Sequence, residues 1–282
     1  MADHPVVACY RGLDSADAIA LGALVARALD QPLVLVSAYR YEPAALSARP
    51  LPDAENERRA DAAAVALHRA REFAGPGIDV HEEIVPSASI VDALVGLARD
   101  VDACMLVVGR DTQGHVTRSL IARAPCPVAV SPLDVPQPRR EPLRRIGIAF
   151  DGSPAAELAL GAAARLALAS GARLELLAAG RTSERAAPSL HAAEQALESA
   201  TLAHTSCALV GDPSTQLAAV AAELDLLVCG SRGRGRSRAK LLGSVSTHLV
   251  AHAACPVLVV APGVARSEAG PLGITSAAAA GV

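Results

Sequence analysis

Aromatic side chains are nearly absent from this sequence: they make up 2% of its 282 residues, and there is no tryptophan. Because 51% of the residues are nevertheless hydrophobic, alanine, valine and leucine must fill the interior. Alanine-rich helices over valine- and leucine-rich strands are typical of a layered α/β protein, whose buried strands are short continuous apolar runs. The length allows two domains, each with a core of its own.

Several other features are missing. No apolar run is long enough to span a bilayer, and the first residues lack the basic and apolar regions of a secretory signal peptide, so we expect a cytoplasmic protein. The six cysteines lie mostly inside apolar runs and do not indicate a disulfide framework. The net charge of −3 predicts no general affinity for nucleic acid or acidic membranes.

One structural unit occurs twice in the chain. The segment Val6-Val-Ala-Cys-Tyr-Arg-Gly12 matches Ile146-Gly-Ile-Ala-Phe-Asp-Gly152, which indicates a strand followed by a tight turn. In both copies strands alternate with helices, which argues for right-handed βαβ crossovers and a parallel sheet. The expected helices include 14–29, 55–74 and 88–99 in the first copy and 154–169, 187–203 and 214–223 in the second.

A proline-rich segment separates the two copies. Residues 131–142 contain four prolines, which is typical of a semi-rigid linker. From Gly263 onward the chain is rich in alanine, glycine and serine without any periodic pattern, which indicates disorder. We therefore expect one domain at 1–133, a second at 143–262 and a disordered tail at 263–282.

The loop after the fourth strand differs between the copies. In the second copy Gly230 and Gly233 follow an apolar strand, and Gly243 with Ser244 opens the next helix. Glycine leaves room for a ligand against the backbone, and the free N–H groups at a helix N-terminus attract phosphate. The basic run Arg234–Lys240 adds positive charge beside that helix end. These features predict a phosphate-binding loop, although neither a Walker loop nor the dinucleotide fingerprint is present.

This loop resembles that of the ATP-binding universal stress proteins. Gly230, Gly233, Gly243 and Ser244 fit the family pattern of glycine, two residues, glycine, nine residues and glycine-serine without a gap. Three other segments also match, namely Ala149–Ser153, Val210–Pro213 and Cys255–Val257. The resemblance covers nearly all of residues 145–261 and, more loosely, residues 5–131.

The resemblance implies two flavodoxin-like or Rossmann-like open sandwiches in tandem, each with a five-stranded parallel sheet in the order 3-2-1-4-5 flanked by helices. Ligands bind such sheets in the crevice where the strand order reverses. The adenine contact of the family falls on Asp151, and its ribose neighbour falls on Gly230. Ala179 and Cys229 are expected to line the base pocket. The residues expected around the phosphates are Arg232, Gly233, Gly243, Ser244 and Val245.

The first copy departs from this pattern in three places. Arg11 stands where the second copy has Asp151, and His115 stands where it has Ser244. The loop from Gly109 to Gly114 is eight residues shorter than its counterpart and lacks the basic run. We therefore expect one ATP per chain, held by the second copy, with Mg²⁺ as a candidate accompanying ion. The first copy is expected to be a structural partner.

The last strand of each copy is an expected sheet edge with unpaired backbone groups. These strands, Cys126–Val130 and Cys255–Val260, are candidates for pairing with each other. Such pairing builds dimers in the family, and a tandem chain can make the same contact internally. A homodimer of the whole chain stays open.

The function implied is that of a nucleotide-dependent regulator of the stress response, not an enzyme, since no residue resembles a general base for attack on the γ-phosphate. A slow ATPase, binding of another adenine nucleotide such as cyclic AMP, and binding of nucleic acid or an acidic partner through the basic run are the alternatives. His248 and His252 have the spacing of metal ligands but no third ligand nearby. Cys126 and Cys255 are expected to serve as small buried hydrophobes.

Overall fold

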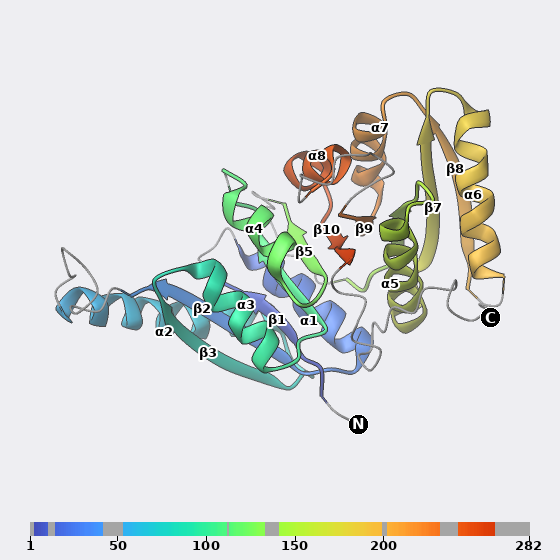
Figure 1. Cartoon of the computed structure of the whole chain (residues 1–282). Helices are drawn as coiled ribbons and strands as arrows, with labels where there is room; N and C mark the ends of the chain where they lie inside the picture. Colours follow the sequence, from blue (N-terminus) through green and yellow to red (C-terminus); the bar gives the residue numbers. More distant parts are fainter. Residues whose placement is uncertain are drawn as a thin grey trace, which may run out of the picture.

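The computed structural model describes residues 3–10, 15–41, 53–111, 113–132, 141–198, 202–231 and 242–262. Strands and helices alternate along the chain, as expected (Figure 1). The strands of the first half are β1 (Val6–Cys9), β2 (Leu33–Arg40), β3 (Val80–Ser87), β4 (Met105–Gly109) and β5 (Val128–Ser131). Those of the second half are β6 (Arg145–Ala149), β7 (Arg173–Gly180), β8 (His204–Val210), β9 (Leu226–Gly230) and β10 (Val257–Val260).

Eight α-helices lie within the described residues, four in each half. They are α1 (Ala16–Leu29), α2 (Asp53–Ala74), α3 (Ile90–Asp100), α4 (His115–Arg123), α5 (Pro154–Ser170), α6 (Ser183–Leu197), α7 (Pro213–Val220) and α8 (Ser244–His252). A short 3-10 helix, η2 (Ala221–Glu223), follows α7. None of these helices has the length and apolar character needed to cross a bilayer.

All ten strands form one sheet in the order β3-β2-β1-β4-β5-β10-β9-β6-β7-β8. Each half therefore has the predicted order 3-2-1-4-5, with parallel pairing inside the half. The halves join where β5 pairs with β10 in antiparallel fashion, Val130 lying opposite Val257 and Val128 opposite Val259. The expected pairing of the two edge strands within one chain is thus present in the structure.

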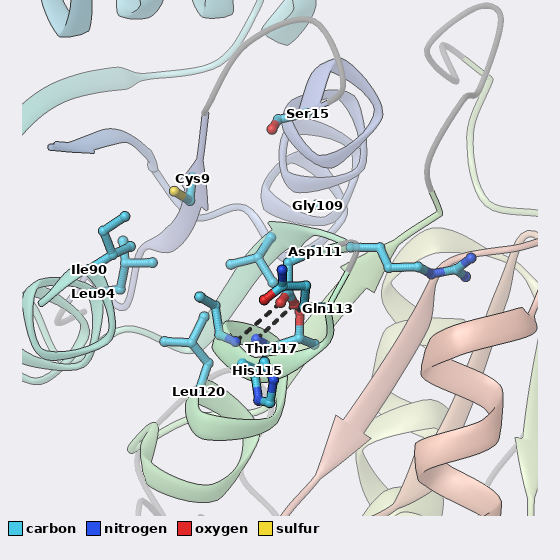
Figure 2. A pocket seen from close by; sticks show the side chains of 13 residues that line it. Cys9, Ser15, Ile90, Leu94, Gly109, Asp111, Gln113, His115, Thr117 and Leu120 are labelled. Atoms are coloured by element: carbon cyan, nitrogen blue, oxygen red, sulfur yellow. Dashed lines mark hydrogen bonds between the residues drawn. The ribbon is translucent and has the colours of Figure 1, made fainter. Parts of the chain in front are cut away.

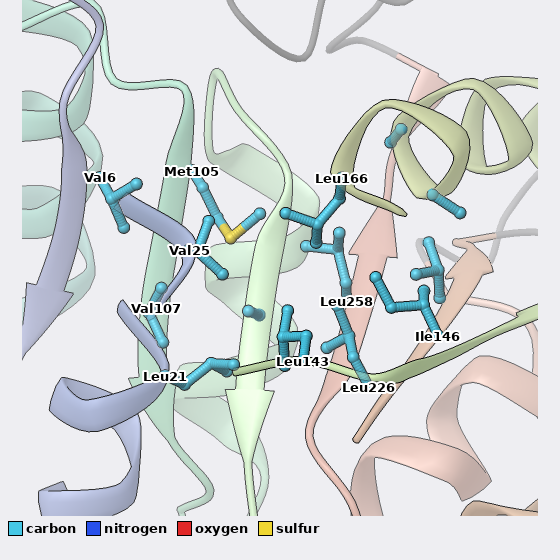
Figure 3. Close-up of a cluster of buried hydrophobic side chains, with 14 of the residues drawn as sticks. Val6, Leu21, Val25, Met105, Val107, Leu143, Ile146, Leu166, Leu226 and Leu258 are labelled. Carbon is cyan, nitrogen blue, oxygen red and sulfur yellow. The ribbon is translucent and has the colours of Figure 1, made fainter. Parts of the chain in front are cut away.

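Helices cover both faces of this sheet. Helices α1, α2, α5 and α6 contribute to the buried cluster on one face, and α3, α4, α7 and α8 contribute to the cluster on the other. The first cluster runs across the junction of the halves: Val25 and Met105 of the first half lie close to Leu166 and Leu258 of the second (Figure 3). Small aliphatic side chains therefore form a continuous core, as the scarcity of aromatic residues predicted.

Local sequence signals explain where α5 begins and ends. The Ser153 hydroxyl accepts a hydrogen bond from the Ala156 N–H at 3.2 Å, and Pro154 occupies the first helical position. Gly171 ends the helix in the left-handed conformation, at φ 72°. This capping fixes the N-terminus of α5 directly after the turn that follows β6.

One predicted helix is wrong in its position. We expected 187–203, but α6 spans Ser183–Leu197 and therefore begins four residues earlier. Thr182 is the extended residue before the helix and Glu184 supplies a first-turn acid, so the start signals precede Pro188, which lies inside the helix. Of the proposed linker at 131–142, residues 133–140 lie outside the described residues and Ser131 is the last residue of β5, and the tail at 263–282 also lies outside them.

Candidate functional site

The strand order reverses between β6 and β9 in the second half, and their carboxyl ends lie side by side. Ala149 is paired with Cys229 in the last register position of this strand pair. Beyond it the chain continues to Phe150 and Asp151 on one strand and to Gly230 on the other. Ligands of open α/β sheets bind in the crevice at this point, so the residues here are candidates for a binding site.

Asp151 closes the turn between β6 and α5. Its Oδ1 accepts a hydrogen bond from the Ser153 N–H at 3.0 Å, and Gly152 between them has φ 70°, a conformation that favours glycine. Asp151 is half-buried. The carboxylate therefore has a structural role in the turn, in addition to the adenine contact that the family resemblance implies.

The structure provides a packing reason for Gly230. A Cβ at this position would lie 2.7 Å from the carbonyl carbon and 2.8 Å from the carbonyl oxygen of Ala155 in the first turn of α5. The sequence analysis assigned this glycine to ligand access. In the structure its absent side chain allows α5 to pack against the end of β9.

Ser231, the residue after β9, is hydrogen-bonded to β10 and to the start of α8. The Ser231 N–H donates to the Val260 carbonyl at 2.8 Å, and the Ser231 carbonyl accepts from the Gly243 N–H at 2.7 Å. The same Ser231 carbonyl accepts from the Ser246 hydroxyl at 3.0 Å. These bonds hold the N-terminus of α8 beside the carboxyl end of β9. Sequence reasoning missed Ser231, whose side chain gives no motif signal.

Within the described part of the chain, the N-terminus of α8 has no side-chain cap. Gly243 precedes the helix and has no side chain to cap it. The hydroxyls of Ser246 and Thr247 donate to carbonyl groups, Thr247 to Gly243 at 2.8 Å. Among the described residues no side chain accepts a hydrogen bond from the backbone N–H of Ser244 or Val245. Ser244 is exposed and is the first residue of α8. Free N–H groups at a helix start attract anions.

The remaining predicted contacts are at different depths. Ala179 lies near the end of β7, next to β6, and both Ala179 and Val245 are half-buried. Cys229 is 3% exposed, and burial raises the pKa of its thiol to about 12. Cys229 is therefore part of the core beneath the crevice. Arg232, Gly233 and the basic run up to Lys240 lie outside the described residues, as does Arg11.

The corresponding point of the first half, between β1 and β4, contains a cavity of about 380 Å³. Its walls come from β1, β4, α3, α4, the β4–α4 loop and Ser15, the residue before α1 (Figure 2). Ile90, Leu94 and Leu120 provide apolar surface, and Gln113 and His115 lie at its exposed side. The first half thus has a hollow at the place where its strand order reverses.

A carboxylate occupies the helix end of this cavity. Asp111 accepts hydrogen bonds from the Val116 N–H at 3.2 Å, from the Thr117 N–H at 3.0 Å and from the Thr117 hydroxyl (Figure 2). Burial alone would raise the pKa of Asp111, but these hydrogen bonds outweigh it, so that the pKa lies below its ordinary value of 3.8. The N-terminus of α4 therefore already binds an anion that belongs to the protein.

Arg110, the residue before Asp111, connects the two halves. One guanidinium nitrogen donates to the carbonyl of Ala253, the residue directly after α8, at 2.8 Å. A cation at a helix C-terminus is favourable because the helix dipole is negative there. Burial lowers the pKa of Arg110, and the neighbouring Cys255 opposes this shift. The short loop of the first half thus contacts the far end of α8.

The histidine pair on α8 and the two cysteines before β5 and β10 are explained by their structural surroundings. The rings of His248 and His252 stack with centroids 4.3 Å apart, and within the described part of the chain no cluster of three or more metal-ligating side chains occurs. Cys126 and Cys255 are both buried, at 4% and 2% exposed, and neither forms a disulfide. Burial raises the pKa of the Cys126 thiol, as expected for a small hydrophobic residue.

Two five-stranded parallel halves of one sheet, each with helices on both faces and a point where the strand order reverses, define the flavodoxin-like class of this protein. The sequence model of the universal stress protein family matches residues 4–132 and, a second time, residues 142–261. The chain therefore belongs to the universal stress protein family.

Two universal stress proteins of Mycobacterium tuberculosis are each 31% identical to this chain. One aligns over 288 residues, covering 91% of this chain and 96% of the relative, and the other over 262 residues, covering 81% and 86%. The crystal structure of a universal stress protein from Archaeoglobus fulgidus DSM 4304 shares the fold. It has a TM-score of 0.68 at 16% identity and covers 91% of this chain and 96% of that one.

Proposed function

We propose that the second half binds one ATP per chain and that this universal stress protein is a nucleotide-dependent regulator. The observation that carries the proposal is the open N-terminus of α8, which the bond from Gly243 to Ser231 holds at the carboxyl end of β9. The phosphates would meet free N–H groups and the positive end of the helix dipole. The adenine would lie toward Asp151 and Ala179.

The motif supports ATP as the ligand in this crevice. Glycines at 230, 233 and 243 with Ser244 fit the pattern of the ATP-binding members of the family, and the basic run between them brings positive charge to a triphosphate. The resemblance also favours Mg²⁺ as an accompanying ion. We expect retention of ATP without rapid turnover, because no residue pattern in the chain supplies a base for γ-phosphate attack.

Replacement of Gly243 tests the proposal. Its φ of −72° and ψ of 162° suit an aspartate that caps the helix, so Gly243→Asp keeps the fold and places a carboxylate at the phosphate position. Two like charges about 4 Å apart repel by about 4 kcal/mol at an effective dielectric constant of 20. We expect ATP affinity to fall at least about 100-fold.

The matched control is Gly243→Asn, which has the same shape without the charge. Calorimetric titration of the full chain with ATP should give one site, a small loss for Gly243→Asn and a large loss for Gly243→Asp. Equal affinities for the two variants would rule out phosphate at the start of α8.

A further inference from the structure

The cavity of the first half has the size and the apolar and polar lining of a small-molecule site, but Asp111 occupies the position where an anion would bind. Its volume of about 380 Å³ lies within the range of ligand pockets. Leu94 of α3 and Leu120 of α4 are buried and form an apolar wall, whereas Gln113 and His115 are exposed at the side of the loop. Figure 2 shows these side chains around the space between α3 and α4. An apolar ligand body could therefore be covered there, with polar groups near the loop.

Asp111 takes the place that an anionic group would need. In an unoccupied helix start the N–H groups of the first turn would be available to a phosphate. Here the N–H groups of Val116 and Thr117 and the Thr117 hydroxyl all donate to the Asp111 carboxylate. A phosphate in this cavity would lack these donors and would meet a like charge.

We infer that this cavity binds a neutral or cationic small molecule of the nucleoside class and rejects its phosphorylated forms. The apolar wall and the polar loop side would take the base and the sugar, and Asp111 stands where the phosphate of a nucleotide would otherwise lie. Adenosine is the probe of choice because the cavity corresponds to the proposed ATP crevice of the second half. The choice of probe rests on the proposed function, whereas the exclusion of phosphate rests on Asp111 alone.

Calorimetric titration of the full chain carrying Gly243→Asp tests the inference, because this background removes phosphate binding at α8. We expect adenosine to bind at least about tenfold more tightly than AMP. Asp111→Asn removes the charge while its amide oxygen still accepts a hydrogen bond. In this variant AMP affinity should rise at least about tenfold, and adenosine affinity should change little.

A second variant locates the site. Ile90 lines the cavity from the start of α3 and is only half-buried, so Ile90→Trp fills the hollow without a change of charge. It should abolish adenosine binding, while circular dichroism and thermal unfolding show that the chain remains folded. No adenosine binding to the parent chain, binding that survives Ile90→Trp, or an AMP-to-adenosine ratio unaffected by Asp111→Asn would each overturn the inference. The proposed ATP site is tested separately, by titration of the unmodified chain with ATP, so that its failure is distinguishable from failure of this inference.

Discussion

The helices α4 and α8 occupy corresponding positions in the two halves, yet the backbone N–H groups at their N-termini differ in side-chain capping. In α4 the carboxylate of Asp111 accepts hydrogen bonds from the first turn. In α8 the first-turn N–H groups of Ser244 and Val245 have no side-chain acceptor within the described residues, and the hydroxyls nearby donate elsewhere. Among the described residues, the start of α4 therefore has a carboxylate acceptor and the start of α8 has none. The two helix starts differ in the length of the preceding loop and in the presence of Asp111.

Asp111 adds a reason to expect that the two halves differ in phosphate binding. Arg11, the shortened loop and His115 are the sequence features from which we expect no ATP in the first half. In the structure the short loop also brings Asp111 to the start of α4, where its carboxylate accepts hydrogen bonds from Val116 and Thr117. The short loop thus places the Asp111 carboxylate at the position that a helix start with free N–H groups would leave to an external anion.

The largest effect on stability is expected at Gly230. Gly230→Ala would place a Cβ 2.7 Å and 2.8 Å from the carbonyl carbon and oxygen of Ala155, and such overpacking costs about 1–3 kcal/mol or more. The free energy of unfolding, measured with urea, should fall accordingly even without nucleotide. The control is Gly96→Ala, where a Cβ meets nothing within 4 Å inside α3 and should stabilise by about 0.5–1 kcal/mol. Equal changes in the free energy of unfolding for the two substitutions would contradict a packing role for Gly230 and leave only a role in ligand access.

Arg110 should contribute less, through its contact with the end of α8. Arg110→Ala removes the 2.8 Å bond to the Ala253 carbonyl, and a hydrogen bond to a charged group contributes about 1.5–3 kcal/mol. We expect the cost near the lower end, because among the described residues the buried Nε of Arg110 has no partner. Hydrogen exchange at the last turn of α8 should speed up at the same time. Unchanged exchange there would show that Arg110 does not connect the halves.

Loss of the Asp111 cap should cost about 1 kcal/mol, the usual effect of removing a helix cap. Asp111→Ala should lower the free energy of unfolding by this amount and increase exchange at the N–H groups of Val116 and Thr117. Asp111→Ser, which retains an acceptor, is the matched comparison and should recover part of the loss. If the alanine variant were as stable as the parent, the carboxylate would not be capping α4.

The smallest effect concerns pH. Since the pKa of Asp111 in the folded protein lies below 3.8, its stabilising contribution is fully present above the unfolded pKa and disappears as the pH falls through the folded value. The parent chain should therefore lose stability more steeply than Asp111→Asn between about pH 4 and pH 2. Parallel curves of unfolding free energy against pH would show that Asp111 does not have a lowered pKa.

Much of the fold could be predicted from the sequence because the unit is repeated. Apolar runs such as Val6–Cys9 and Leu226–Gly230, alternating with alanine-rich helices, specify a parallel sheet, and two exposed edges of similar sequence favour β5–β10 pairing. The start of α6 was missed because Pro188 resembled a helix start although the signals at Thr182 and Glu184 precede it.

The roles of individual site residues were harder to predict. Asp111 carries no motif, and its importance depends on where a short loop places it in space. The crossing of Arg110 to Ala253 joins residues 143 positions apart. Likewise, Gly230 looks the same in sequence whether a ligand or the backbone of Ala155 lies against it. Local patterns report periodicity and spacing, whereas these contacts arise from packing between distant segments.

Photoaffinity labelling tests the central claim that only the open helix end accepts ATP. The full chain is labelled with 8-azido-ATP under light, digested, and its labelled peptides are mapped by mass spectrometry. The account predicts labelled peptides from residues 145–262 alone, with labelling suppressed by excess ATP and lost in Gly243→Asp. Labelled peptides from the walls of the first-half cavity, competed equally by ATP, would contradict it.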